Sequence, residues 1–353
     1  MRCAIAGSGV AALAAYATLR HGGIPAEEIV VFGTDADPTA QWRVRAEAIR
    51  QRRMRSESDG HLAPASFPGL AVREAARRGS LRPLIQSVAD RYHPTVEDFL
   101  AHASEVRSRS GWDRSFVAHR VERIRAVDGG FELDGEGPFA HVLVATGHPG
   151  LARMPGTVHA YEPHEYASRV AIVGAGMAAA TEWLNALDAG AEVISVRRRE
   201  PVRRPLNVPR PFFSKRGLSG YHALSNERRA AKLRELAAPS FPPGPAWDKP
   251  LETERFRVEP EPPDGCQVIA ATGFLKGYRH DPLLADLVEE YELTTHGRWI
   301  VLDPDSTVPA LTDDTRTLAL SGVAAQWAFP AADTIAGAKY TAHAFLRRLC
   351  RTR

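Results

Sequence analysis

Two short glycine patterns are the parts of this 353-residue chain that point most directly to chemistry. Gly7-x-Gly9-x-x-Ala12 and Gly174-x-Gly176-x-x-Ala179 each follow an apolar run and precede an alanine-rich stretch. In such a pattern the first glycine makes a tight turn, the second lets the backbone approach a pyrophosphate, and the last small residue lets the helix lie against the strand. The N-terminus of that helix then presents N–H groups and a partial positive charge to the phosphates.

We therefore predict two dinucleotide-binding turns. A tight strand-to-helix turn without a ligand is the simpler alternative, but a second apolar strand follows each pattern at the expected distance, at 29–32 and at 193–196. The residues expected to contact a cofactor are Gly7, Ser8, Gly9, Val10, Ala11 and Ala12 in the first turn and Gly174, Ala175, Gly176, Met177, Ala178 and Ala179 in the second.

The end of the second strand is where such a fold contacts the ribose. In the first unit this position is Gly33 and the nearest acid is Asp35, so we expect either Asp35 or the backbone to contact the ribose. In the second unit Arg197, Arg198 and Arg199 follow the strand. Guanidinium groups form paired, charge-assisted hydrogen bonds with phosphate oxygens, which favours the 2′-phosphate of NADPH over NADH. A solvated basic loop is the alternative.

Composition and cysteine content argue against several other classes. The net charge of +3 is too small to indicate a nucleic-acid partner. No run of about 18 apolar residues predicts a membrane span, and the N-terminus enters a strand pattern at once, so we expect a cytoplasmic protein without a signal peptide. The cysteines form no Cys-x-x-Cys pair, which argues against a dithiol centre and a four-cysteine metal site. We predict no metal site.

The histidines are scattered and are interpreted as loop or core residues rather than as catalytic bases. They are His61, His93, His148, His159 and His164.

The elements that must hold the two turns repeat along the chain. Helices are predicted at 10–21 and 177–189, each ending before a glycine, and a further helix is predicted near 226–236. Two strands end in Ala-Thr-Gly, at Gly147 and Gly273.

These repeats predict an α/β fold of two nested Rossmann-like units of the three-layer type. A glycine turn and a long helix over 321–348 have no strand unit of their own and must complete the first sheet. We therefore expect the first domain to comprise 1–160 and 265–353, with the second domain, 161–264, inserted in it.

Taken together, these motifs resemble the flavin-containing monooxygenase superfamily, which includes the N-hydroxylating enzymes that oxidise amines. The resemblance covers nearly the whole chain: the two glycine turns, both Ala-Thr-Gly strands, a linker that contains His159, and the C-terminal helix. The linker differs from the family's signature, because Met154 stands where a phenylalanine is usual and only two residues separate Gly156 from His159.

The resemblance implies FAD on the first unit and NADPH on the second. Trp42 and Arg43 begin a basic segment, 43–55, that is either a solvated helix face or a segment whose start passes over the flavin pyrophosphate. Beyond the first glycine turn, the residues expected at the FAD site are Asp35, Trp42, Arg43, Val121, Thr146, Gly147 and Gly322.

The reaction that the resemblance implies is oxygenation of a small nitrogen or sulfur nucleophile. NADPH would reduce the flavin, which would then take up oxygen as a hydroperoxide that attacks the substrate. The expected partners are a small-molecule substrate and molecular oxygen, and a homodimer is left open. His61, Trp327 and Phe329 are expected to line the substrate space, although the two aromatic residues are equally consistent with plain core.

Two alternatives remain open. One is a reductase that passes electrons from NADPH through the flavin to a quinone or an iron–sulfur protein, and the other is a redox-sensing flavoprotein without turnover.

Overall fold

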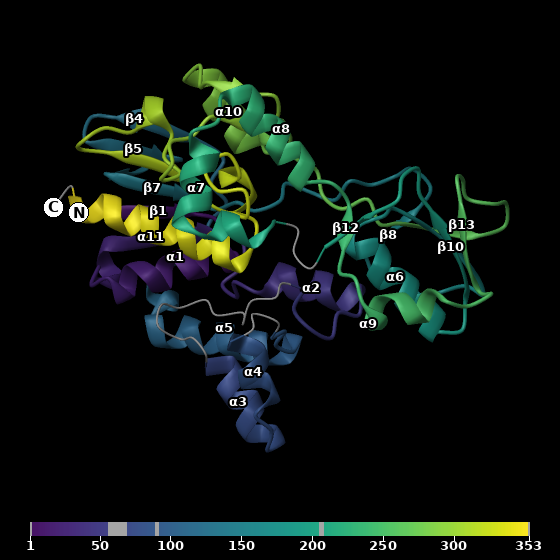
Figure 1. The fold of residues 1–353 in the computed structure, drawn as a ribbon. Helices are drawn as coiled ribbons and strands as arrows, with labels where there is room; N and C mark the ends of the chain where they lie inside the picture. Colours follow the sequence, from purple (N-terminus) through teal and green to yellow (C-terminus); the bar gives the residue numbers. More distant parts are fainter. Residues whose placement is uncertain (1, 56–68, 89–91, 205–207, 352–353) are drawn as a thin grey trace.

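The computed structural model describes residues 2–55, 69–88, 92–204 and 208–351 (Figure 1). Its centre is a parallel sheet of five strands in the order β17-β7-β1-β2-β3. Strands β2 and β3 lie on one side of β1, and β7 and β17 lie on the other, so the strand order reverses between β1 and β7. In open α/β sheets, ligands bind at the carboxyl ends of the strands at such a reversal. The strands are β1 (Cys3–Ala6), β2 (Ile29–Gly33), β3 (Phe116–Ala118), β7 (His141–Val144) and β17 (Thr317–Leu320).

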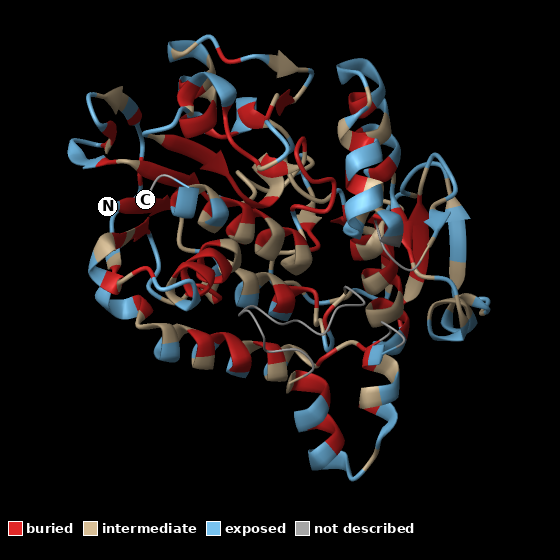
Figure 2. Cartoon of the chain, turned by 60° about the vertical axis from the view of Figure 1, so that its left-hand side comes forward, coloured by how far each residue is buried: buried red, intermediate tan, exposed pale blue. Residues whose placement is uncertain are grey.

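Both faces of this sheet are covered, which explains its continuous apolar strands. Alternate residues of β1 point to opposite faces: Cys3 and Ile5 pack among the helices, whereas Ala4 and Ala6 pack toward a three-stranded antiparallel sheet. Figure 2 shows the buried strands between these layers. The three-layer α/β prediction is thereby confirmed. The covering elements are α1 (Val10–His21), α5 (Val96–Ser110), α11 (Ile335–Arg351), β4 (Ile124–Val127), β5 (Gly130–Leu133) and β6 (Glu136–Phe139).

A second parallel sheet repeats this plan in the order β13-β10-β9-β14-β8, with its reversal between β9 and β14. Helix α6 packs its small residues and Trp183 against one face of β9 and β10. The elements are β8 (Val158–His159), β9 (Arg169–Val173), α6 (Met177–Asp188), β10 (Glu192–Val196), β13 (Phe256–Glu259) and β14 (Gln267–Ala270).

Strands β8 and β14 lie outside the bounds of 161–264 that we expected for the inserted domain. The reason is that each Ala-Thr-Gly strand pairs with the strand before its own glycine turn: β7 with β1, and β14 with β9. The second sheet therefore begins with β8 and closes with β14. By contrast, β17 and α11 complete the first sheet and its helical layer, as expected.

The other elements surround these two sheets. Helices α3 and α4 project away from the first sheet at the bottom of Figure 1. The remaining elements are α2 (Ala40–Ala48), α3 (Gly69–Arg78), α4 (Arg82–Val88), β11 (Val202–Arg203), α7 (Lys215–His222), α8 (Asn226–Leu236), β12 (Ser240–Phe241), α9 (Pro245–Asp248), α10 (Pro282–Glu290), β15 (Thr295–His296) and β16 (Trp299–Ile300).

The basic segment after α2 joins the two units. Asn185 of α6 donates a 2.8 Å hydrogen bond to the carbonyl of Ile49, and Arg50 donates one of 2.8 Å to the carbonyl of His164. Arg55 donates a 2.7 Å hydrogen bond to the hydroxyl of Tyr161. Arg50 and Arg55 are therefore partly buried against the second unit rather than fully solvated.

A buried pair of a histidine and a carboxylate lies beside this junction. Nε2 of His164 lies 2.9 Å from a carboxylate oxygen of Glu182, and both side chains are almost completely buried. Burial opposes charging of His164, but hydrogen bonds to Glu182 and to the Glu162 carbonyl outweigh it and raise the pKa of His164, while Arg50 acts in the opposite direction. Tyr166 also donates to Glu182, at 2.9 Å.

This pair makes stability depend on pH. The pKa of His164 is higher in the folded protein than in the unfolded chain. The pair therefore contributes its full stabilisation to the free energy of unfolding below pH 6.5, the ordinary histidine pKa being about 6.5, and this stabilisation is lost as the pH rises through the raised pKa of the folded state. His164→Gln should lower the free energy of unfolding at pH 6 by about 3 kcal/mol, since it leaves the buried carboxylate of Glu182 without a cationic partner. Urea titrations at pH 6 and pH 8.5 measure this. The same loss at both pH values would contradict a charged pair.

Candidate functional site

The first glycine turn has the geometry of a phosphate cradle. Gly7 has a φ of +121°, and a Cβ there would lie 2.3 Å from the carbonyl oxygen of Ala145, so only glycine fits. Gly9, in contrast, has an ordinary φ of −82°, and a Cβ there would meet no atom within 4 Å. Nothing in the protein itself therefore requires Gly9. A ligand that approached the backbone closely would require it, and α1 begins at Val10 with no side chain capping its N–H groups.

The second turn repeats this division of roles. Gly174 has a φ of +142°, and a Cβ there would lie 2.6 Å from the carbonyl oxygen of Ala271. Gly176 has a φ of −97°, and its Cβ would come no closer than 3.9 Å to Pro239. Again the second glycine leaves open space in front of an uncapped helix N-terminus. Both turns thus fit a pyrophosphate.

Ser8 explains why the first unit lacks an acid at the end of its second strand. A Cβ on Gly33 would lie 2.2 Å from Oγ and 2.3 Å from Cβ of Ser8. The serine side chain fills the space that an acidic residue at position 33 would need. Asp35 is exposed, two residues beyond β2, and its contact with a ribose remains a prediction.

This clash gives a testable double substitution. Gly33→Asp should lower the free energy of unfolding by about 1–3 kcal/mol, because it overfills a packed contact. Adding Ser8→Gly should recover most of that loss. Thermal unfolding of the two variants and of Ser8→Gly alone checks the coupling. Equal destabilisation with and without Ser8 would contradict it.

The structure places the other residues expected at the first site as follows. The ring of Trp42 packs 4.9 Å from that of Phe99, and Arg43 forms a 2.9 Å ion pair with Asp37. Val121 is buried in the core.

The remaining residues of this group lie at the carboxyl ends of the central strands. Thr146 uses its hydroxyl in a 2.6 Å hydrogen bond to Asp281. Gly322 follows β17 with a φ of +64°, and a Cβ there would lie 4.0 Å from the Cβ of Ala11. The fold thus brings Ala11, Gly147 and Gly322 to one edge of the first sheet. That these residues contact a cofactor remains a prediction.

The three arginines after β10 differ from one another. Arg197 is largely buried: its guanidinium lies 5.6 Å from the Trp183 ring and forms a 3.0 Å ion pair with Glu200. Arg198 and Arg199 are exposed at the carboxyl end of the same strand. Arg197 is therefore held within the protein, whereas Arg198 and Arg199 have the freedom to meet a phosphate.

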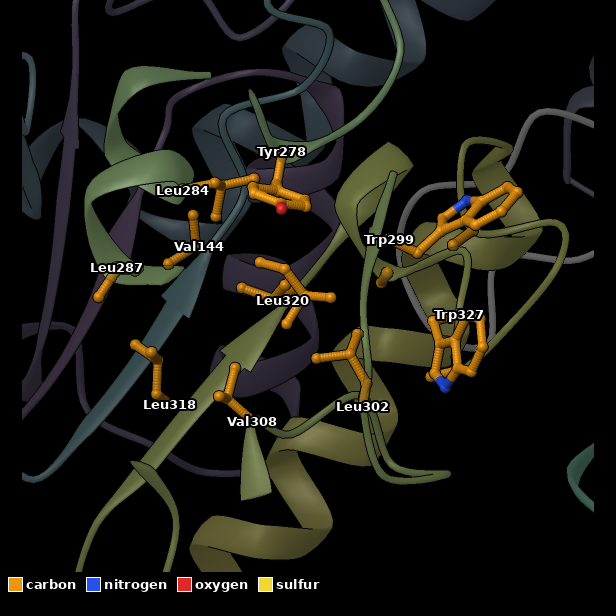
Figure 3. Close-up of a cluster of buried hydrophobic side chains, with 14 of the residues drawn as sticks. Val144, Tyr278, Leu284, Leu287, Trp299, Leu302, Val308, Leu318, Leu320 and Trp327 are labelled. Atoms are coloured by element: carbon orange, nitrogen blue, oxygen red, sulfur yellow. The ribbon is translucent and has the colours of Figure 1, made fainter. Parts of the chain in front are cut away.

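The structure gives little support to the three residues that were expected to line the substrate space. His61 lies outside the described residues. Trp327 is 0% exposed and Phe329 is 2% exposed, and both belong to the hydrophobic core. Figure 3 shows Trp327 in this cluster. Phe329 stacks on Tyr340 at 4.5 Å. Both aromatic residues therefore lie in the hydrophobic core, which was the second interpretation of these residues from the sequence.

The histidines of the linkers are structural. Nε2 of His159 donates to the carbonyl of Gly273 at 3.0 Å, and its Nδ1 accepts from the backbone N–H of Tyr161 at 3.1 Å. This fixes the linker to the second Ala-Thr-Gly strand. His148 stacks on Phe274 at 4.3 Å, and burial lowers the pKa of His148 to about 4, so its ring is neutral at physiological pH.

A cavity opens at the same edge of the first sheet. Its walls come from four regions that lie far apart in the sequence: the loop after β7, the loop after β14 with the start of α10, the β15–β16 hairpin, and the loop after β17. The lining residues are Gly147, Pro149, Lys276, Gly277, Tyr278, Asp281, Leu284, Arg298, Trp299, Ile300, Val323, Ala324 and Gln326. Most of them were missed by sequence reasoning. The sequence feature that could have pointed to this cavity is Lys276, which lies three residues after the second Ala-Thr-Gly.

The described residues show three further features. The cysteines lie on separate parts of the fold, in β1, just before β14 and in α11. No set of three histidine, cysteine, aspartate or glutamate side chains within the described ranges is arranged to hold a metal. Among the helices that the structure describes, we find none with the length and apolar character needed to cross a membrane.

Comparison with known proteins identifies the fold. No family model matches the sequence, and no curated protein matches it either. Among solved structures, ornithine hydroxylase from Pseudomonas aeruginosa is 16% identical with a TM-score of 0.67, and 99% of each chain is covered. The FAD-bound cadaverine monooxygenase of the desferrioxamine pathway from Erwinia amylovora is 12% identical with a TM-score of 0.71, over 98% of this chain and 93% of that one.

A bacillithiol disulfide reductase from Bacillus cereus has a similar fold. It is 15% identical with a TM-score of 0.57, over 98% of this chain and 99% of that one. The chain thus has the two-unit fold of N-hydroxylating flavin monooxygenases, as the resemblance implied, and a reductase shares that fold. Fold alone does not choose between these reactions.

Proposed function

We propose that this chain is an FAD- and NADPH-dependent monooxygenase that oxygenates the nitrogen of a small amine. The observation that carries the proposal is the pair Gly9 and Gly176, neither of which the protein's own packing requires. Two such turns on two parallel sheets support two dinucleotides in one chain. The fold neighbours named above, which act on ornithine and cadaverine, support the choice of an amine.

The residues of the chain would bind and orient the reactants. The N-termini of α1 and α6 would hold the two pyrophosphates, and Arg198 and Arg199 would hold the 2′-phosphate of NADPH. When bound, the flavin supplies hydride acceptance and oxygen activation. The largely buried loop after β17 would exclude water from the reacting edge of the first sheet.

The overall reaction consumes one NADPH, one proton and one oxygen molecule for each amine converted to a hydroxylamine and water. A small amine and oxygen are the proposed partners, and the cytoplasm and a homodimer stay as expectations.

The test is turnover by purified, FAD-loaded protein. NADPH oxidation, oxygen uptake and product formation are measured with lysine, ornithine, cadaverine and putrescine, and mass spectrometry detects the added oxygen atom. We expect one of these amines to be hydroxylated and NADPH to be preferred to NADH. NADPH oxidation coupled to a quinone or to a protein acceptor, without an oxygenated product, would instead establish a reductase. Failure of NADPH to reduce the flavin would favour the sensor.

A further inference from the structure

The loop that leads from the first sheet to the second and the loop that leads back are paired with each other. The first leaves the carboxyl end of β7, and the second leaves the carboxyl end of β14. Leu151 and Phe274 form an antiparallel bridge between them, so the two loops make one short ribbon. The hydrogen bonds across this ribbon, both 2.9 Å, run from the N–H of Ala152 to the carbonyl of Gly273 and from the N–H of Leu275 to the carbonyl of Gly150.

Four aromatic rings form a stack beside the ribbon. The Phe274 ring lies 4.3 Å from that of His148, with 16° between the ring planes, and 5.0 Å from that of Tyr161, with 23° between the planes. His159 stacks in turn on Tyr161, at 5.7 Å and 25°. His148 belongs to the loop after β7, whereas Tyr161 and His159 lie at the end of β8 in the second sheet. Phe274 is therefore the ring that joins the first loop to the second unit.

Two arginines of the first unit lie against this ring stack. The guanidinium of Arg45, on the helix α2 that lies between the two units (Figure 1), is 4.9 Å from the centre of the Phe274 ring. The guanidinium of Arg55 is 5.6 Å from the centre of the Tyr161 ring, and contacts of this kind are attractive. Burial, helped by neighbouring cations, lowers the pKa of His148 to about 4. The His148 ring is therefore neutral and does not repel Arg45.

The ribbon begins where both glycine turns are packed. A Cβ on Gly7 would lie 2.3 Å from the carbonyl oxygen of Ala145, and a Cβ on Gly174 would lie 2.6 Å from that of Ala271. Ala145 and Ala271 are the first residues after β7 and β14. The ribbon thus connects the two carboxyl edges at which the cofactors are proposed to bind. A tilt of one edge relative to the other would strain the ribbon and separate the stacked rings.

We propose that Phe274 is a positioning residue for hydride transfer. Its ring, held between His148 and Tyr161 and in contact with Arg45, fixes the orientation of the carboxyl edge of the second sheet relative to that of the first. This rests on the proposed function, since it takes FAD and NADPH to occupy these two edges. The competing account is that the same rings are ordinary core, which would contribute stability alone.

Hydrogen exchange of the FAD-loaded protein tests the ring stack without any nucleotide or amine. Phe274→Leu keeps an apolar side chain but removes the ring contacts, and it should speed exchange of the Ala152 and Leu275 amides about tenfold or more. Arg45→Gln should act in the same direction by about two- to fivefold. Phe256→Leu is the matched control, because Phe256 is also half-buried but packs on α6 within the second unit. It should leave the ribbon amides unchanged.

Anaerobic mixing with NADPH tests the positioning itself. At saturating NADPH, Phe274→Leu should lower the rate constant of flavin reduction about tenfold or more while the Kd of NADPH changes less than about twofold, since misplaced reacting groups lose rate rather than affinity. Phe274→Tyr retains the ring and should restore both the reduction rate and the slow exchange. Phe256→Leu should change neither the rate constant nor the Kd.

Different outcomes overturn this inference and the proposed function. Faster exchange of the ribbon amides with unchanged flavin reduction, or equal effects in Phe256→Leu, would leave Phe274 as ordinary core. Unchanged exchange in Phe274→Leu would show that the rings do not hold the ribbon. Normal reduction of the wild-type flavin without any oxygenated amine would contradict the monooxygenase and leave the positioning role in place. Failure of NADPH to reduce the wild-type flavin would overturn both.

Discussion

Gly9→Asp is expected to purify as a colourless protein without FAD. The substituted side chain would place both atoms and a negative charge in the open space before the N-terminus of α1, where a pyrophosphate would lie. Since a Cβ at this position meets no protein atom within 4 Å, the fold itself should tolerate the change. The measurement is the ratio of flavin absorbance to protein absorbance after purification, with at least a 100-fold fall in FAD affinity expected from the lost and repelled phosphate contacts.

Two companion variants make this result specific. Gly9→Ala adds bulk without charge and should weaken FAD binding less than Gly9→Asp does. Gly176→Asp applies the same change to the second turn, and it should keep the yellow flavin while it abolishes reduction by NADPH. A yellow Gly9→Asp protein, or a colourless Gly176→Asp protein that remains folded by circular dichroism, would refute the assignment of the two turns.

Arg198→Gln combined with Arg199→Gln is expected to lower NADPH affinity by about 2–4 kcal/mol while NADH affinity stays the same. Charge-assisted hydrogen bonds to phosphate are the stronger kind, and these two arginines are exposed at the carboxyl end of β10. The measurement is the dissociation constant of each nucleotide, from titration of the oxidised protein. Equal affinities of the wild-type protein for NADPH and NADH would show that the choice of cofactor is wrong.

Arg197→Gln separates the contributions of the three arginines. Because Arg197 is held by Glu200 and Trp183, its loss should lower the stability of the second unit more than it lowers nucleotide discrimination. A fall in NADPH affinity from Arg197→Gln as large as that from the double variant would mean that the buried arginine reorients to meet the phosphate.

Local patterns predicted the elements around the two turns closely. Helix α1 covers the residues 10–21 that the alanine-rich run indicated, and α8 covers 226–236. These helices were recognisable because a glycine turn or a strong helix-forming run sets their limits within a few residues. The first and second turns were recognisable for the same reason, since their spacing is local.

Contacts between distant segments were not predictable in this way. The strand β14 belongs to the second sheet because it pairs with β9, and nothing in its own sequence distinguishes this from pairing in the first sheet. The cavity is similar, since Lys276 and Arg298 meet only after the β15–β16 hairpin has packed on the loop after β14. The aromatic character of Trp327 and Phe329 could not separate a cavity wall from core, because both uses bury the same rings.

The pairing of β17 with β7 has a consequence for the order in which a ribosome releases this polypeptide. Because β17 and α11 come last, the first sheet cannot close until almost the entire chain has been synthesised. All strands of the second sheet, from β8 to β14, emerge earlier as one uninterrupted stretch. During translation the second unit therefore has all its strands before the first unit does, and β7 pairs with its last neighbour only when β17 emerges.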